Sequence, residues 1–239
     1  MRRKLIWILA CSLLAFTSGY TQNKIALSAY AGSGVSYFRG KASVSQSDYH
    51  RNGLLFPNAV DSMGNHFGRK SRGNFLAGLQ LEYPLSKKWS LLLNTQYEHT
   101  GAALKGDSVI APTGNFKTDG DYWINYFFVS INPQLARNFE KGNTRFSIHS
   151  GFEYSLGVNR SDRFDFIDQA GKKFSIGHSG GDPEVNDFRI SVGTTVQKRK
   201  WGLGLNYKHG LSNFNKGETQ KAFMRLFQFK LMYRIVGSH

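Results

Sequence analysis

The sequence predicts an all-β chain that folds as an eight-stranded antiparallel transmembrane up-and-down β-barrel. Three observations predict this fold: an N-terminal export signal, segments in which apolar and polar residues alternate, and connections that are alternately long and short. Successive side chains of a strand point to opposite faces, so each alternating segment has one apolar face and one polar face. After the signal, no segment with helical periodicity competes with this pattern.

Residues 1–22 have the layout of a secretory signal peptide. Three basic residues precede an apolar stretch from Leu5 to Phe16, and small residues suited to cleavage follow. The stretch is too short to cross a membrane as a helix. Cys11, the one cysteine, lies inside it, and a lipoprotein anchor at Cys11 is the alternative to its removal. Residues 23–239 are expected to form a single barrel domain.

Eight segments show the alternation expected of barrel strands. In chain order they are Lys24–Phe38, Gly73–Pro84, Trp89–Gly101, Asp121–Arg137, Thr144–Asn159, Val185–Gln197, Trp201–Phe214 and Ala222–Val236. The first has Ile25, Leu27 and Ala29 on one face. Apolar residues alternate in the same way in the others, most regularly at Phe75, Leu79, Leu91, Leu93, Ile131, Phe146, Ile148, Phe188, Ile190, Leu203, Leu205, Phe227 and Phe229.

The connections between these segments alternate in length. Polar loops are predicted at Arg39–Arg72, Ala102–Gly120, Arg160–Glu184 and Asn215–Lys221, and short turns are predicted at Leu85–Lys88, Asn138–Asn143 and Lys198–Lys200. Outer-membrane barrels have short periplasmic turns and longer external loops. The sequence therefore predicts an outer-membrane location with both chain termini in the periplasm.

Aromatic residues gather where the predicted strands meet the short turns. The residues on the apolar face at that end are Tyr83, Trp89, Phe146, Trp201 and Tyr233. Aromatic belts of this kind mark the two interfaces of a membrane. We therefore predict an aromatic belt at the periplasmic end of the barrel.

The polar face of the predicted strands carries charges of both signs. They are Glu82, Glu98, Glu153, Arg189, Lys208, Lys230 and Arg234. An eight-stranded barrel is just wide enough for side chains to fill, so a polar lumen predicts an ion-pair cluster. Two alternatives remain open: a narrow path for protons or small solutes, and a soluble barrel whose polar face is the solvated exterior.

Neither catalytic residues nor a cofactor are predicted. A lipid A deacylase-like enzyme would need a nucleophile, base and acid together, and His149, His178 and His209 are the histidines considered for it. No deacylase pattern surrounds them. No metal site is predicted, although Asp182, Glu184 and Asp187 in a predicted loop could meet a divalent cation.

The chain is strongly basic, with a formal net charge of +15. An exported chain without a nucleic-acid motif is not expected to bind nucleic acid. Outer-membrane lipid and lipopolysaccharide are the expected partners of a basic surface, together with other envelope proteins at the external loops. A monomer is expected.

Two segments resemble the PorT-like outer-membrane β-barrel family of Bacteroidota. Tyr126–Leu135 is similar to a strand motif of that family, although Pro133 follows Ile131 by two residues instead of one. Leu203–Phe214 is similar to a second motif, from which it departs at Ser212 and Phe214. The resemblance implies an eight-stranded barrel. It also implies, as one version of the function, a component of a secretion or envelope assembly.

Overall fold

The computed structural model describes residues 25–50, 62–63, 67–111, 114–167, 171–181, 185–215 and 220–237. The predicted signal peptide lies outside these residues. Eight strands form the barrel wall: β1 (Ala26–Arg39), β4 (Arg72–Pro84), β5 (Trp89–Ala111), β6 (Gly114–Lys141), β7 (Thr144–Ile167), β9 (Asn186–Lys198), β10 (Trp201–Gly210) and β11 (Phe223–Val236).

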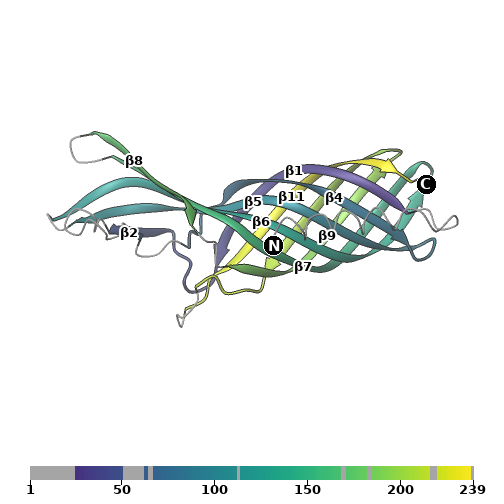
Figure 1. Cartoon of the computed structure of the whole chain (residues 1–239), viewed down its shortest axis with the longest axis horizontal. Helices are drawn as coiled ribbons and strands as arrows, with labels where there is room; N and C mark the ends of the chain where they lie inside the picture. The colour runs from purple at the N-terminus through teal and green to yellow at the C-terminus, as the bar shows by residue number, and fades with distance from the viewer. Residues whose placement is uncertain are drawn as a thin grey trace, which may run out of the picture.

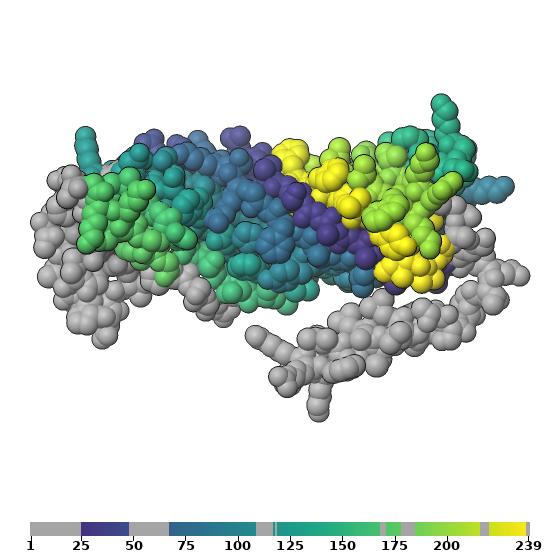
Figure 2. Space-filling view, turned by 90° about the horizontal axis from the view of Figure 1, so that it is seen from above, coloured from purple at the N-terminus to yellow at the C-terminus, as the bar shows by residue number. Residues whose placement is uncertain are grey.

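Each wall strand pairs antiparallel with the next in this order, and β1 pairs with β11 to close the ring (Figure 1). The predicted eight-stranded up-and-down barrel is therefore confirmed. Figure 2 shows β1 and β11 lying side by side on the surface. Two glycines allow this close approach: a Cβ at Gly32 or Gly34 would lie 2.0 or 1.9 Å from a carbonyl oxygen of β11.

The apolar face of the wall points outward. Leu91, Leu205 and Phe229 are 45%, 60% and 45% exposed. The polar residues that alternate with such apolar residues along each strand are buried. Such a continuous apolar surface is unfavourable in water and favourable against lipid tails. The barrel is thus a transmembrane barrel, and the alternative of a soluble barrel with its apolar face inward is wrong. No helix among the described residues is long and apolar enough to cross a membrane.

Three short turns lie at one end of the barrel, which we call the turn end. The described chain also starts and finishes there, since Leu27 pairs with Val236. Two turns are tighter than predicted, because pairing continues to Lys141–Thr144 and to Lys198–Trp201. Their first residues, Gly142 and Arg199, have φ angles of 58° and 54°, which suit a two-residue hairpin connection.

Two of the predicted long loops, Ala102–Gly120 and Arg160–Glu184, are wrong over most of their described residues, because strands continue through them. β5 and β6 remain paired as far as Ala111 and Gly114, and β7 extends to Ile167, where β8 (Lys173–Gly181) pairs with it. β2 (Gln46–His50) lies parallel to β5, and β3 (Ser62–Met63) pairs with β2. Cross-strand hydrogen bonds explain how such polar segments remain extended.

These additions form a sheet that projects beyond the wall, on the left of Figure 1. We call it the arm: β2, β3, β8 and residues 105–111, 114–121 and 161–167 of β5, β6 and β7. One further boundary differs from the prediction. β10 ends at Gly210 rather than Phe214, because the chain turns at this point and Phe214 becomes buried inside the barrel mouth.

Candidate functional site

The middle of the lumen contains a fully buried ion cluster. Arg189 of β9 is ion-paired with Glu98 of β5, with Glu153 of β7 at 2.9 Å and with Asp187 at 2.6 Å. Lys208 of β10 binds the same two glutamates, at 3.1 Å from Glu98 and 2.6 Å from Glu153. Strands from both sides of the ring are therefore joined across the lumen through two cations.

Neutral side chains supply further hydrogen bonds to the two glutamates of this cluster. The Oε2 atom of Glu98 accepts hydrogen bonds from Gln96 at 2.6 Å and from Gln228 at 2.9 Å. Glu153 accepts from Asn132 at 2.9 Å and from Ser155 at 3.0 Å. Buried charges are tolerated when their lone pairs and protons are satisfied in this way.

A second ion group lies nearer the turn end. Glu82 of β4 is ion-paired with Arg145 of β7 and lies 3.6 Å from Arg234 of β11. Ser90 donates a 2.7 Å hydrogen bond to Glu82, and Arg234 also donates to Gln197 at 2.7 Å. The structure thus divides six of the seven predicted lumen charges between two groups instead of one.

Lys230 belongs to neither group, although it was predicted to be part of the cluster. Its ammonium nitrogen lies 4.5 Å from the centre of the Tyr30 ring and 3.5 Å from Gln96 Oε1. Among the described residues it has no carboxylate within 4.0 Å. Its charge is balanced by a ring face and an amide oxygen rather than by an ion pair.

Two members of the ion groups, Arg145 and Asp187, were not predicted from the sequence as lumen charges. Arg145 alternates with the outward Phe146 and Ile148, so the period-two pattern could have placed it in the lumen. Asp187 was considered as a loop acid for a cation, but it lies in β9, buried and bonded to Arg189. Asp182 and Glu184, named with it, lie outside the described residues.

The other half of the lumen, toward the arm, is filled by an aromatic plug. Phe38 of β1 packs edge to face on Phe67, Phe214 and Tyr126, with ring centres 5.3, 5.1 and 6.2 Å apart. Buried Leu104, Ile124, Phe128, Met224 and Leu226 surround these rings. Backbone hydrogen bonds hold the entering segments, for example Phe38 N to Gly68 O at 3.0 Å. This plug was not predicted from the sequence.

The five residues of the predicted aromatic belt lie at the turn end. Tyr83, Trp89, Phe146, Trp201 and Tyr233 are between 39% and 57% exposed on the outward face. Trp201 packs on Tyr233 with ring centres 5.0 Å apart. The belt side chains therefore face the surroundings of the barrel and not its lumen.

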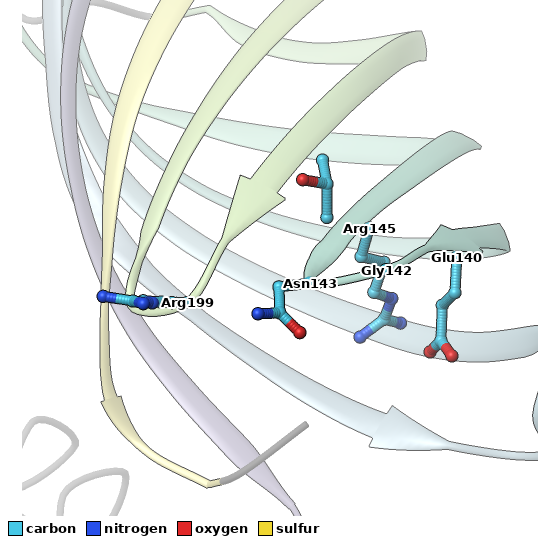
Figure 3. A pocket seen from close by; sticks show the side chains of 6 residues that line it. Glu140, Gly142, Asn143, Arg145 and Arg199 are labelled. Atoms are coloured by element: carbon cyan, nitrogen blue, oxygen red, sulfur yellow. The ribbon is translucent and has the colours of Figure 1, made fainter.

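A concavity of about 360 Å³ opens between the turns at the same end (Figure 3). Glu140, Gly142 and Asn143 line it from the β6–β7 hairpin, with Arg145 beside them and Arg199 from the β9–β10 turn. Arg145 links this concavity to the second ion group, because its guanidinium is ion-paired with Glu82.

The histidines considered for catalysis lie in separate places. His149 contacts Thr195 Oγ1 at 3.2 Å in the lumen, and His209 contacts the Tyr207 hydroxyl at 3.1 Å. Neither makes a hydrogen bond to a serine or a carboxylate among the described residues. The side chain of His178 lies outside the described residues.

The arm carries an open groove of about 480 Å³ on its outward face. Its lining includes Lys105, Asp119, Asp121, Trp123, Arg163 and Asp165. Lys105 lies 3.1 Å from both Asp119 and Asp121, and hydrogen bonds to these two carboxylates raise the pKa of its ammonium group. The guanidinium carbons of Arg72 and Arg163 lie 5.6 and 5.9 Å from the centre of the Trp123 ring.

Neither a family model nor a curated protein matches the chain, so the resemblance to the PorT-like family stays a prediction. Among solved structures, Ail, the attachment invasion locus protein of Yersinia pestis, is 12% identical, with a TM-score of 0.36 over 90% of this chain and 100% of that one. Neisserial surface protein A is 11% identical, with a TM-score of 0.38 over 87% and 96%. The outer membrane protein AlkL is 12% identical, with a TM-score of 0.28 over 92% and 93%. These scores are low, and the fold described above rests on the strand pairing of this chain.

Proposed function

We propose that this chain is an integral outer-membrane protein whose closed barrel anchors the arm for interaction with another component of the envelope. One observation carries the proposal: ion pairs and packed side chains fill the lumen, while β2, β3, β8 and the extended parts of β5, β6 and β7 project as a sheet beyond the wall. The barrel serves as the support, and the arm is the part of the sheet that projects from it.

The filled lumen argues against the solute channel. A solute entering from the arm end meets the rings of Phe38, Tyr126 and Phe214, all within 5% exposure. Beyond them lie Arg189 and Lys208, whose charges are already paired. Transport would require both layers to open. An enzyme is not proposed either: among the described residues, His149 and His209 contact the hydroxyls of Thr195 and Tyr207, but no carboxylate bonds to either imidazole to complete a triad.

The arm has features of an interaction surface. Its groove presents an indole ring between two guanidinium groups, together with paired charges of both signs. Among the described residues β8 pairs only with β7, and β3 pairs only with β2, so each leaves one strand edge without a partner. Unpaired edges can accept an extended segment of another chain.

The remaining parts of the proposal follow from the sequence. A secretory signal and a transmembrane barrel favour the outer membrane, and the short turns favour a periplasmic turn end with both termini on that side. Membership of the PorT-like family and a place in a secretion or envelope assembly are proposed on the two matching segments. Lipopolysaccharide is the proposed lipid neighbour at the arm end. A monomer is proposed because the wall has no open edge.

Site-specific photo-crosslinking in intact cells tests the role of the arm. A photoreactive residue replaces Lys173 in β8 or Asp119 in the groove. The control places the same residue at Lys221, which is exposed and lies outside the arm. We expect a discrete adduct from the two arm positions and none from Lys221. A correctly inserted barrel that yields no adduct from either arm position would contradict the proposed role.

Fractionation of the envelope tests the location. The protein is expected in the outer-membrane density fraction and in the detergent-extracted material. Release of the processed chain by water or salt alone would contradict an integral membrane location.

A further inference from the structure

The three short turns are basic, and their charges lie at one end of the barrel. Seven exposed basic residues occur in and beside these turns: Lys87, Lys88, Arg137, Lys141, Lys198, Arg199 and Lys200. We call them the basic collar. One exposed acidic residue, Glu140, lies among them. Among the described residues, no collar residue is ion-paired with a carboxylate.

The arm end differs, although it also carries many basic residues. There Lys105 is paired with Asp119 and Asp121, and Arg163 is paired with Asp165 at 2.8 Å. Cations at that end are thus partly neutralised within the protein. The charges of the collar cations must instead be neutralised by groups outside the protein.

Two collar residues reach the lipid-facing surface of the wall. The guanidinium carbon of Arg137 lies 5.8 Å from the centre of the Trp89 ring and 5.3 Å from that of Phe139. The ammonium nitrogen of Lys200 lies 6.0 Å from the centre of the Tyr233 ring. These rings belong to the outward aromatic surface, so the two cations stand where the apolar band gives way to polar head groups.

Backbone hydrogen bonds fix the collar at this level. The amide of Asn138 donates to the carbonyl of Lys88 at 2.7 Å, and the amide of Arg234 donates to that of Lys200 at 2.7 Å. Each turn is therefore tied to the neighbouring hairpin or strand. Basic charges that share one end of the barrel, beside its lipid-facing surface, match a layer of phosphates better than they match a single soluble anion.

We propose that the basic collar binds the head groups of anionic phospholipids in the leaflet next to the short turns. The proposal rests on the proposed function only in requiring that the barrel spans a membrane. Lysine and arginine near an anionic lipid surface are attracted to its phosphates, and the attraction weakens with salt. An acidic protein surface is the rival occupant, but the contacts of Arg137 and Lys200 with lipid-facing rings favour lipid.

Quenching of tryptophan fluorescence by brominated lipids tests the collar directly. Trp89 and Trp201 lie beside it, and Trp123→Phe removes the tryptophan at the arm end. The mature protein is reconstituted in phosphatidylcholine bilayers in which an equal fraction of brominated phosphatidylglycerol or brominated phosphatidylcholine is included. At low salt we expect the anionic lipid to be enriched around the barrel by about 3-fold to 10-fold, and the enrichment to fall with added salt.

Two charge variants distinguish an effect of the collar from an effect of the protein's net charge. The collar variant replaces Lys87, Lys88, Lys198, Arg199 and Lys200 by Gln, and the matched variant replaces Lys41, Lys70, Lys105, Lys173 and Lys221 by Gln. The collar variant should lose the preference for the anionic lipid, and the matched variant should keep it. Replacing chloride by inorganic phosphate at constant ionic strength should leave the preference in place, since a free anion is not the proposed ligand.

Four outcomes would overturn the proposal. Equal quenching by the two lipids in the wild type would show that the protein does not prefer the anionic lipid. An unchanged preference in the collar variant would place the lipid-binding surface elsewhere on the protein. A protein adduct captured at the collar without any lipid preference would assign the surface to an acidic protein. Absence of quenching by either lipid would mean that the barrel is not in the bilayer, which would overturn the proposed function as well.

Discussion

The two halves of the lumen are filled by opposite chemistry. Toward the turn end, buried charges such as Arg189 and Glu98 are paired across the ring, whereas toward the arm the rings of Phe38 and Phe214 pack together. The two meet at Phe128, over whose ring the Arg189 guanidinium lies at 4.8 Å. Side chains fill the lumen in both halves, although those of one half are charged and those of the other are aromatic.

The largest expected effect is in the charged half. Arg189→Met leaves three buried carboxylates with one cation fewer, which should lower the free energy of unfolding by about 3–5 kcal/mol. Urea unfolding in detergent, followed by tryptophan fluorescence, measures this loss. Arg137→Met removes an exposed arginine and should change stability by no more than about 0.5 kcal/mol. Equal unfolding midpoints for the two variants would contradict a stabilising role of the buried ion cluster.

The aromatic half should respond almost as strongly, but through volume rather than charge. Phe38→Ala leaves a cavity at the centre of the plug and should cost about 3–5 kcal/mol. Phe38→Leu keeps most of the volume and should cost less than about 1.5 kcal/mol. The same urea titration distinguishes them. A plug in which both substitutions cost the same would not be closely packed.

The two buried lysines sharpen the comparison within the charged half. Lys208 binds two carboxylates, while Lys230 contacts a ring and an amide oxygen. Lys208→Met should therefore cost about 3–5 kcal/mol, and Lys230→Met less than about 1.5 kcal/mol. A larger loss for Lys230→Met than for Lys208→Met, in parallel urea titrations, would show that the lumen pairing differs from that described.

The smallest effect is expected for ion pairs outside the barrel. The pKa of Asp165 is lowered: burial acts against this, but hydrogen bonds from Arg163 and Ser175 outweigh it. Its stabilising contribution is thus present above its usual pKa and is lost as the pH falls through the lower folded value. Asp165→Asn should cost less than about 1 kcal/mol, because Arg163 is 60% exposed. Thermal unfolding near neutral pH and in acid checks both statements.

The sequence predicted the charged half better than the aromatic half, for a physical reason. Where outward Leu205 alternates with inward Asn206 and Lys208, the period-two contrast is strong and the wall strands are recognisable. At Tyr126–Phe128 both faces are apolar and the contrast disappears. Phe67 and Phe214 come from connecting segments, so only the folded chain brings them to Phe38.

The arm and the ion pairs depend on register, which a single sequence does not provide. Residues 105–121 are polar and rich in glycine, and they resemble a loop until Lys105 is seen to pair with Asp121 across two strands. Glu98 and Lys208 are 110 residues apart. Alternation placed both in the lumen, but only the closure of the ring brings them together.

Ion conductance in planar lipid bilayers tests the central claim most directly. Paired charges and the aromatic plug together fill the lumen, so the purified barrel should insert and give no conductance above the bare membrane. Phe38→Ala should also give none, because the ion cluster still closes the other half. Steady single-channel steps from the wild-type protein would contradict a filled lumen.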